Sequence, residues 1–460
     1  MATDDASHTS TGPAAAGRAL HVGVDIGGTF TDAVVVDPAT GQVVMAFKTP
    51  STPRAPADAV RAALQRVSQE LGVRGATVCH GTTIGTNALI ERTGAPTALL
   101  ATKGFADVIE LRRQDRPTLY DLAVTLSEPL VEPARRVEVE ERVAASGEVI
   151  APLSGVDAVL DRIQALGVTS VAISLLHAYA NPAHERALKE ALRRRFPRMF
   201  VTASSEICPE YGEYERTSTT VVNSYIGPPV KDYLEELASE IRRERMHRLL
   251  IVKSNGGLTS SGNATRFPAH LIESGPAAAV IATAAYARSI GRPDTIVFDM
   301  GGTTAKAGVI AGFTPRMIPE FKADALRHGR NVGGHPIRSA VLDLVEIGAG
   351  GGSIAWIDEA GVPKVGPASA GADPGPACYG RGGERPTVTD AHAVIGTLGA
   401  ETFRGTGIDF WRERAVRAVG LHVARPLGWS VEKAAHAIIG IAVANMTEMV
   451  KLATVRRGLD

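Results

Sequence analysis

The chain has 460 residues, of which 44% are hydrophobic and 21% charged, and its formal net charge at pH 7 is zero. This length is enough for two or three domains with a sizeable core, and the neutral charge balance gives no electrostatic reason to expect a nucleic-acid partner. The three cysteines, Cys79, Cys208 and Cys378, lie far apart in sequence and form no Cys-x-x-Cys pair, which argues against a disulfide framework or a zinc finger.

The amino-terminal segment 1–19 is small and polar and has no apolar core of the kind that signal peptides carry. We therefore expect it to be a disordered leader. The longest apolar run, Pro276–Ala287, is too short to span a bilayer. Together with the reducing environment that the separated cysteines favour, these observations predict a cytoplasmic protein without a membrane segment.

The segment Val22–Asp37 reads VGVDIGGTFTDAVVVD and predicts a strand, a tight turn and a second strand. The two glycines of the turn let a large anion approach the backbone N–H groups, because no Cβ stands in the way. Asp25 precedes them, and a carboxylate there can hold a hydrated Mg²⁺ against phosphates. The candidate phosphate-binding residues of this turn are Gly27, Gly28, Thr29 and Thr31. A plain β-hairpin would also explain the glycine pair taken alone.

The rest of the amino-terminal half predicts an α/β unit. Residues 20–48 predict three short strands, and residues 55–71 carry apolar side chains at helical spacing. A further strand ends at His80, where a helix begins soon after, so His80 is either an acid or base of the site or a structural histidine. Helices and strands alternate over residues 151–204, which is typical of a parallel sheet.

The alternating pattern breaks near residues 205–230, where we place a domain boundary. A helix is expected over residues 211–225, and the sequence Gly227-Pro-Pro229 is expected to end it. Another helix should then run to about residue 245. Within residues 272–287, Gly275-Pro276 is expected to open an Ala-rich helix.

A second copy of the first turn occurs in Thr295–Gly308, which reads TIVFDMGGTTAKAG. Its candidate site residues are Asp299, Gly301, Gly302 and Thr303. Turn chemistry alone would not repeat both the aspartate and the threonine. The repetition therefore indicates two related half-folds that face one nucleotide. The arrangement resembles the actin-like ATPase superfamily of sugar kinases, heat-shock chaperones and actin, in which each half contributes one phosphate-binding turn.

Glycine-rich segments follow the second turn. The segment over residues 348–353 has almost no side chains, so that a ligand can lie against it or its N–H groups can bind an anion. Its candidate residues are Gly350, Gly351, Gly352 and Ser353. It is not a GxGxxG fingerprint, and the chain has no Gly-Lys pair of the Walker type. Residues 366–390 predict an irregular loop, where neither Cys378 as a nucleophile nor Asp390 with His392 as a metal site can be argued from sequence. Residues 411–456 predict helix.

A series of longer motifs, in order along residues 20–460, looks like the hydantoinase A / 5-oxoprolinase family. The motifs are DIGGTFTD, HGTTIGTNALIERTGA, CPEYGEYERTSTTVVNSYIGP, SNGG, ESGPAAA, DMGGTTAKAG, EIGAGGGSIAWID and VGPASAGADPGPACYGRGGERPTVTDA. The resemblance implies an α/β, actin-like ATPase (ribonuclease H-like) fold of two lobes with a cleft between them. It also implies an amino-terminal hydantoinase/oxoprolinase domain over residues 20–205 and a hydantoinase A domain over residues 206–460.

The family resemblance implies an ATP-dependent enzyme that transfers the γ-phosphate to a carbonyl or enolate oxygen. The first expectation is hydrolysis of a cyclic amide, such as a hydantoin or 5-oxoproline, by an A-type subunit in a hetero-oligomer with a hydantoinase B-like partner. The alternatives are the phosphorylating subunit of an acetone- or acetophenone-type carboxylase and an ATP-binding fragment without turnover. ATP and Mg²⁺ are the implied cofactors, with Asp25 and Asp299 as the catalytic and metal-holding carboxylates.

The chain departs from the family in two ways. Many members have Asp where this chain has Lys306, and a lysine there favours phosphate over a metal ion. Family chains also usually continue past the point where this chain ends at Asp460, into another glycine-rich segment of the nucleotide cleft. We therefore interpret the sequence as a truncation, a split gene or an incomplete enzyme, with part of the adenine site expected to be missing.

Overall fold

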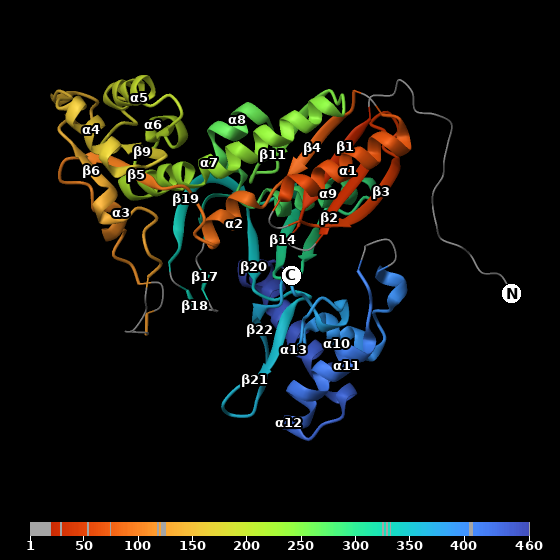
Figure 1. The fold of residues 1–460 in the computed structure, drawn as a ribbon. Helices are drawn as coiled ribbons and strands as arrows, with labels where there is room; N and C mark the ends of the chain where they lie inside the picture. Colours follow the sequence, from red (N-terminus) through yellow and green to blue (C-terminus); the bar gives the residue numbers. More distant parts are fainter. Residues whose placement is uncertain are drawn as a thin grey trace.

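The computed structural model describes residues 20–459, except 28–29, 53–54, 74, 117–118, 121–125, 324–325, 328–329, 332 and 404–407. The leader expected at residues 1–19 therefore lies outside the described residues. Figure 1 shows two α/β units side by side, joined by the long helix α7, and below them a lobe built from the carboxyl-terminal strands and helices.

The first sheet has six strands in the order β12-β11-β4-β1-β2-β3, and it confirms the strands expected over residues 20–48. The central strand β1 is antiparallel to β2 and parallel to β4. Helix α1 (Pro56–Leu71) covers the sheet with Val60, Leu64 and Val67, which are fully buried. The strand bounds are β1 His21–Ile26, β2 Phe30–Val36, β3 Val43–Pro50, β4 Thr77–Gly81, β11 Arg248–Val252 and β12 Leu258–Ser260.

The second sheet has the order β10-β9-β5-β6 with all strands parallel, as the alternation of helices and strands predicted. Its helices bury an apolar stripe against the strands, for example Leu160 and Ile163 from α4 and Leu188 from α5. The bounds are β5 Thr97–Thr102, β6 Arg136–Val139, β9 Ser170–Ser174, β10 Phe200–Ala203, α4 Val156–Leu166 and α5 Ala183–Arg195.

Helix α7 runs unbroken over Glu213–Arg243, so the expectation that Gly227-Pro-Pro229 ends a helix was wrong. A proline removes one N–H and leaves the carbonyl four residues earlier without its helical partner. Both carbonyls find other donors here. The Oγ of Ser170 donates to the carbonyl of Ser224 over 2.7 Å, and the N–H of Ala95 donates to the carbonyl of Tyr225 over 2.8 Å. Contacts from β9 and from the loop before β5 therefore keep the helix continuous.

The third sheet repeats the hairpin of the first, with β13 (Thr295–Met300) antiparallel to β14 (Ala305–Ala311). Strand β14 also pairs with β15 (Thr314–Pro315) and β20 (Leu344–Ile347), and helix α9 (Ser274–Ser289) packs against the sheet. A two-stranded ribbon of β16 (Met317–Ala323) and β19 (His335–Leu342) connects this sheet to α7.

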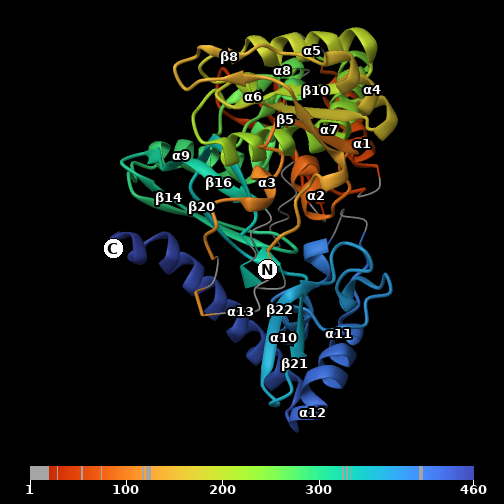
Figure 2. The ribbon, with the colours of Figure 1, turned by 90° about the vertical axis from the view of Figure 1, so that its left-hand side faces the viewer.

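The carboxyl-terminal lobe is built around a buried cluster that includes Val388, Ile438 and Ala442. Its elements are β21 Ser353–Ile357, β22 Pro363–Ser369, α10 Val388–Ile395, α11 Arg412–Val419, α12 Arg425–Leu427 and α13 Val431–Ala453. Figure 2 shows α13 running from this lobe toward β14 and β20, against which Met449 and Ala453 pack. Among the described residues, Val431–Arg457 is the one helical stretch long and apolar enough to span a membrane. The sequence analysis considered only the run at 276–287 and did not identify this stretch. Only 28% of its most apolar window is buried, and Val443, Leu452 and Val455 are exposed, so packing against the two strands covers part of its apolar surface.

Candidate functional site

The two glycine turns have the same hydrogen bond at equivalent positions. The N–H of Gly27 donates to the carbonyl of Phe30 over 2.9 Å, and the N–H of Gly301 donates to the carbonyl of Thr304 over 2.9 Å. Each bond closes a tight turn between two antiparallel strands. The repeat seen in the sequence is therefore a repeat of structure, as predicted.

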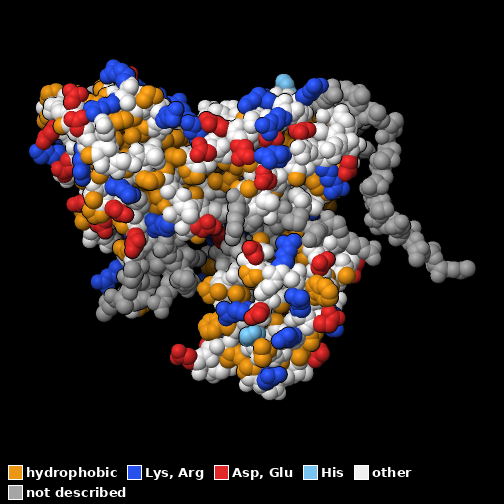
Figure 3. All heavy atoms as spheres, in the orientation of Figure 1, with side chains coloured by type: hydrophobic (Ala, Val, Ile, Leu, Met, Phe, Trp, Pro, Cys, Tyr) orange, Lys and Arg blue, Asp and Glu red, His pale blue; other side chains and the backbone are white. Residues whose placement is uncertain are grey.

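Both turns line one cavity of about 380 Å³. The predicted residues that border it are Asp25, Gly27, Asp299, Gly301, Gly302, Gly351 and Gly352. Asp25 and Asp299, far apart in sequence, therefore face the same space. Figure 3 shows one face of the molecule, on which basic and acidic side chains are interspersed over both the upper units and the lower lobe.

The remaining predicted residues lie elsewhere or outside the described chain. Gly28 and Thr29 lie outside the described residues. Thr31 is fully buried, and its hydroxyl hydrogen-bonds the Ser51 hydroxyl over 3.0 Å. Ser51 in turn donates to the carbonyl of Gly27 over 2.8 Å, so Thr31 supports the turn from behind. Thr303 is exposed at the tip of the second turn and does not border the cavity.

The glycine loop after β20 holds the second turn in place. The N–H of Gly351 donates to the carbonyl of Gly301 over 3.0 Å, and the N–H of Gly352 donates to the carbonyl of Gly302 over 2.7 Å. The N–H of Gly350 donates to the buried hydroxyl of Ser353 over 2.8 Å. These three N–H groups are thus engaged within the protein, and the loop is not the free anion nest that the sequence suggested.

Asp25 is exposed to solvent where it borders the cavity, although many protein atoms lie around its carboxylate. Burial, and then repulsion by Asp32 and Asp299, raises the pKa of Asp25 to about 6, whereas Lys48 and Lys306 act in the opposite direction. Asp25 is therefore held in a site with more negative than positive charge.

Asp32 and Lys48 are site residues that the sequence analysis missed. Both border the cavity. The register of the sheet places Asp32 opposite Asp25 on β1 and opposite Lys48 on β3, so the three side chains form a row across one face. The hairpin sequence could have revealed Asp32, because residues equally distant from a turn pair across the two strands. That prediction required the position of the turn to be known first.

Asp25, Asp32 and Asp299 are the carboxylates beside the cavity that would hold an ion bound together with phosphates. Among the described residues, no group of three or more His, Cys, Asp or Glu side chains is arranged to hold a metal ion. Burial, and after it the charges of Asp32 and Asp299, raises the pKa of Asp25. Mg²⁺ usually keeps several waters and binds through one or two carboxylates plus phosphate oxygens. A hydrated Mg²⁺ would relieve the repulsion among these carboxylates.

His80 has a structural position. It is fully buried, its Nδ1 lies 2.9 Å from the carbonyl of Val24, and its Nε2 lies 2.7 Å from the hydroxyl of Tyr233. Because Nδ1–H must donate to the carbonyl, Nε2 accepts from Tyr233. Burial lowers the pKa of His80 to about 4, so the ring is neutral and does not contact the cavity.

This burial predicts a pH dependence of stability. The pKa of His80 is lower in the folded chain than its ordinary value of 6.5, so between pH 6.5 and 4 the unfolded chain binds a proton that the folded chain does not. The contribution of His80 to stability is therefore complete above pH 6.5 and falls by about 3 kcal/mol on acidification to pH 4. Urea unfolding of wild type and His80→Asn at pH 7 and pH 5 measures it. The variant should lose less stability than wild type over this range, whereas equal losses would contradict the assignment. Exposed His247→Asn is the control.

Cys378 and Asp390 also have structural roles. Burial, with the neighbouring Asp390, raises the pKa of the Cys378 thiol, which makes it a poor nucleophile. The Asp390 carboxylate is fully buried and accepts the backbone N–H groups of Ala377, Cys378 and Thr387 over 2.8–3.1 Å. Asp390 therefore orders the irregular loop that precedes α10.

Sequence profiles match almost the whole chain. Residues 21–196 match the hydantoinase/oxoprolinase N-terminal region, and residues 216–460 match hydantoinase/oxoprolinase. The caprolactamase alpha subunit of Pseudomonas jessenii is 36% identical over 453 residues, which are 95% of this chain and 63% of that subunit. The acetophenone carboxylase gamma subunit of Aromatoleum aromaticum is 30% identical, over 95% of this chain and 61% of that subunit.

Two solved structures share the fold. The ATP-dependent caprolactamase of Pseudomonas jessenii has a TM-score of 0.74 at 34% identity, and nucleotide-free acetone carboxylase has a TM-score of 0.80 at 25% identity. The alignments cover 96% and 95% of this chain but 64% and 63% of the matched chains. The predicted two-lobed α/β, actin-like ATPase fold is thus confirmed, and the chain spans less than two thirds of the length of each of these relatives.

Proposed function

The chain belongs to the hydantoinase/oxoprolinase family, and on this premise we propose that it uses ATP to hydrolyse a cyclic amide. The observation that carries the proposal is the convergence of two equivalent Asp-x-Gly-Gly turns on one cavity. Such a pair of turns suits a chain of phosphates, and a carboxylate from each turn suits the Mg²⁺ that accompanies them. The name of the caprolactamase alpha subunit, a relative over 95% of this chain, supports a cyclic amide as the acceptor.

The proposed chemistry makes the amide carbon electrophilic. The amide oxygen attacks the γ-phosphorus, the bond to the β-phosphate oxygen breaks, and ADP leaves. Water then attacks the carbon that carries the phosphorylated oxygen, the C–N bond of the ring breaks, and the nitrogen takes a proton. A second water releases phosphate, so one lactam, one ATP and two waters give one amino acid, ADP and phosphate. Bound Mg²⁺ would neutralise phosphate charge, with Asp25 and Asp299 as its protein partners.

We also propose the setting of this activity. The relatives named as alpha and gamma subunits support a hetero-oligomer, and the family supports a hydantoinase B-like chain as the partner. The three free cysteines and the mixed surface charge support a cytoplasmic location without a nucleic-acid or membrane partner.

The second candidate is the phosphorylating subunit of a ketone carboxylase. It is supported by the 30% identity with an acetophenone carboxylase subunit and by the likeness to acetone carboxylase. A third candidate, an ATP-binding module without turnover, has no specific observation in its favour.

The experiment that separates these candidates is a screen for substrate-stimulated ADP release, with and without the B-like chain. Ring opening of a lactam or hydantoin supports the proposal. Bicarbonate-dependent consumption of a ketone supports the carboxylase instead, and the absence of stimulated ADP release with every substrate, in both conditions, supports the module.

The raised pKa of Asp25 predicts a pH dependence of nucleotide binding. Below about pH 6 Asp25 takes up a proton and loses the charge that a hydrated Mg²⁺ needs. The affinity for the magnesium complex of a non-hydrolysable ATP analogue should therefore fall as the pH drops through 6. Because the nucleotide titrates in a similar range, the readout is the ratio of wild-type to Asp25→Asn affinities. This ratio should shrink between pH 7 and pH 5, and a constant ratio would refute the role of Asp25.

A further inference from the structure

A second cavity, here called the Lys306 cavity, has a volume of about 640 Å³ and is lined by residues that follow the second turn. Thr304 and Lys306, which follow that turn on β14, line it together with residues of α2 (Ile84–Ile90), β16 and β20. Its size is within the range of small-molecule sites. The sequence analysis expected Lys306 to favour phosphate over a metal ion, and in the structure Lys306 lines this cavity.

A row of polar side chains joins the two cavities. The register of the third sheet places Lys306 opposite Asp299 on β13 and opposite Glu346 on β20. Paired residues of antiparallel strands share a face of the sheet. Asp299 borders the first cavity and Glu346 borders the Lys306 cavity. Lys306 is therefore one strand away from Asp299 and the proposed phosphate site.

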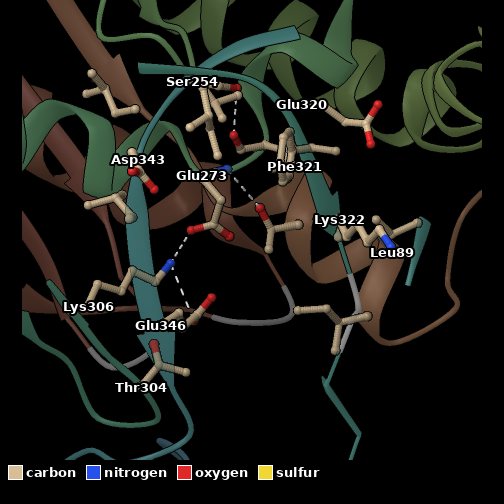
Figure 4. Close-up of a pocket in the computed structure, with 18 of the residues that line it drawn as sticks. Leu89, Ser254, Glu273, Thr304, Lys306, Glu320, Phe321, Lys322, Asp343 and Glu346 are labelled. Carbon is tan, nitrogen blue, oxygen red and sulfur yellow. Dashed lines mark hydrogen bonds and ion pairs between the residues drawn. The ribbon is translucent and has the colours of Figure 1, made fainter. Parts of the chain in front are cut away.

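The Lys306 ammonium is held between two carboxylates. It contacts Glu273 and lies 3.5 Å from Glu346, and Figure 4 shows both carboxylates converging on it. Burial opposes the charged form, but the two carboxylates outweigh burial and raise the pKa of Lys306. Glu273 has a left-handed backbone (φ 67°), an uncommon state for a non-glycine residue. An ammonium has three N–H donors, so two carboxylate partners leave one for a ligand.

The walls of the Lys306 cavity are mostly apolar, with Leu89, Ile272, Ile318 and Phe321 among them. Its cations already have acidic partners. Lys306 contacts Glu273, Arg457 contacts Asp343, and Lys322 lies 3.9 Å from Asp115. A carboxylate on a ligand would add a third negative charge beside Glu273 and Glu346, while an uncharged ring would meet the apolar walls and the remaining N–H donor of Lys306.

We propose that the Lys306 cavity binds the acceptor of the phosphoryl group, and that this acceptor is an uncharged cyclic amide whose carbonyl oxygen accepts a hydrogen bond from Lys306. The inference rests on the proposed function and adds the acceptor site and its selectivity. The ring lies among the apolar walls, and its oxygen faces the row that leads to Asp299 and the phosphate turns. An acceptor with a carboxylate, such as 5-oxoproline, is disfavoured.

The test compares 2-pyrrolidinone with 5-oxo-L-proline, which share the lactam ring and differ by one carboxylate. Binding of each is measured by calorimetry on the full chain, with and without the magnesium complex of a non-hydrolysable ATP analogue. We expect 2-pyrrolidinone to bind about tenfold more tightly. Equal binding, tighter binding of 5-oxo-L-proline, or binding of neither lactam would overturn the proposal.

Two variants locate the site. Lys306→Met removes the donor and Ile318→Trp fills the cavity, and each should weaken 2-pyrrolidinone binding by about tenfold or more. Lys364→Met and Ile150→Trp are the same substitutions at exposed positions and should have no effect. If one of the two site variants does not fold, the other still tests whether the lactam binds in this cavity. Unchanged lactam binding in the folded site variants would refute this cavity. Failure of the ATP analogue to bind wild type would instead refute the proposed function, since lactam binding is measured separately.

Discussion

Asp25→Asn is expected to reduce ATP turnover by about 100-fold or more. Removal of one group that stabilises charge in a transition state usually has an effect of this size. The substitution keeps the shape of the side chain and removes the charge on the first turn. Asp299→Asn should have a similar effect, because Asp299 faces the same cavity from the second turn. The measurement is steady-state ADP release at saturating substrate, with the partner chain present.

The same variant should not weaken the fold. Asp25 in its charged form is disfavoured by burial and by repulsion from Asp32 and Asp299, so a neutral amide should leave the thermal midpoint of the nucleotide-free chain equal to wild type or higher. Asp58→Asn, at an exposed position on α1, is the control and should retain activity. Wild-type turnover in Asp25→Asn, or loss of activity only together with loss of folded protein, would remove Asp25 from the site.

The second large effect is expected for Gly350→Ala. A Cβ at this position would lie 2.7 Å from the carbonyl oxygen of Gly301 and 2.7 Å from the carbonyl carbon and oxygen of Gly302. All three are backbone atoms of the second turn, so the turn must move. Overpacking of this kind costs about 1–3 kcal/mol. The displaced turn should lower the affinity for the magnesium complex of an ATP analogue by about tenfold or more.

The control for this prediction is Gly440→Ala. Gly440 lies within helix α13, and a Cβ there meets no atom within 4 Å. The replacement should stabilise the chain slightly, by up to about 1 kcal/mol, because alanine favours helix over glycine. Calorimetric titration of both variants with the analogue is the measurement. Equal affinities in Gly350→Ala and Gly440→Ala would show that the loop does not position the turn.

The local sequence was sufficient to predict the two turns. An apolar strand, an aspartate and two glycines specify a strand and a tight turn, and the second copy at Asp299 indicates that the two belong together. The structure brings Asp25 and Asp299 to one cavity as predicted. Their roles in catalysis and metal binding remain predictions, as do those of the glycines beside them.

Features that depend on distant partners were not predictable in this way. The helix across Pro228 and Pro229 persists because Ser170 and Ala95, both far away in sequence, donate to the freed carbonyls. The N–H groups of the glycine loop are engaged by the second turn, which a local pattern cannot reveal. Lys306 pairs with Glu273 because α9 begins next to β14. In each case the register or packing of separate elements decides the outcome.

The most direct test of the account is a crystal structure of the chain with Mg²⁺ and a non-hydrolysable ATP analogue. We expect the terminal phosphates between the turns at Gly27 and Gly301, with Asp25 and Asp299 reaching the same ion directly or through water. A nucleotide bound against only one turn, or in another part of the molecule, would contradict it.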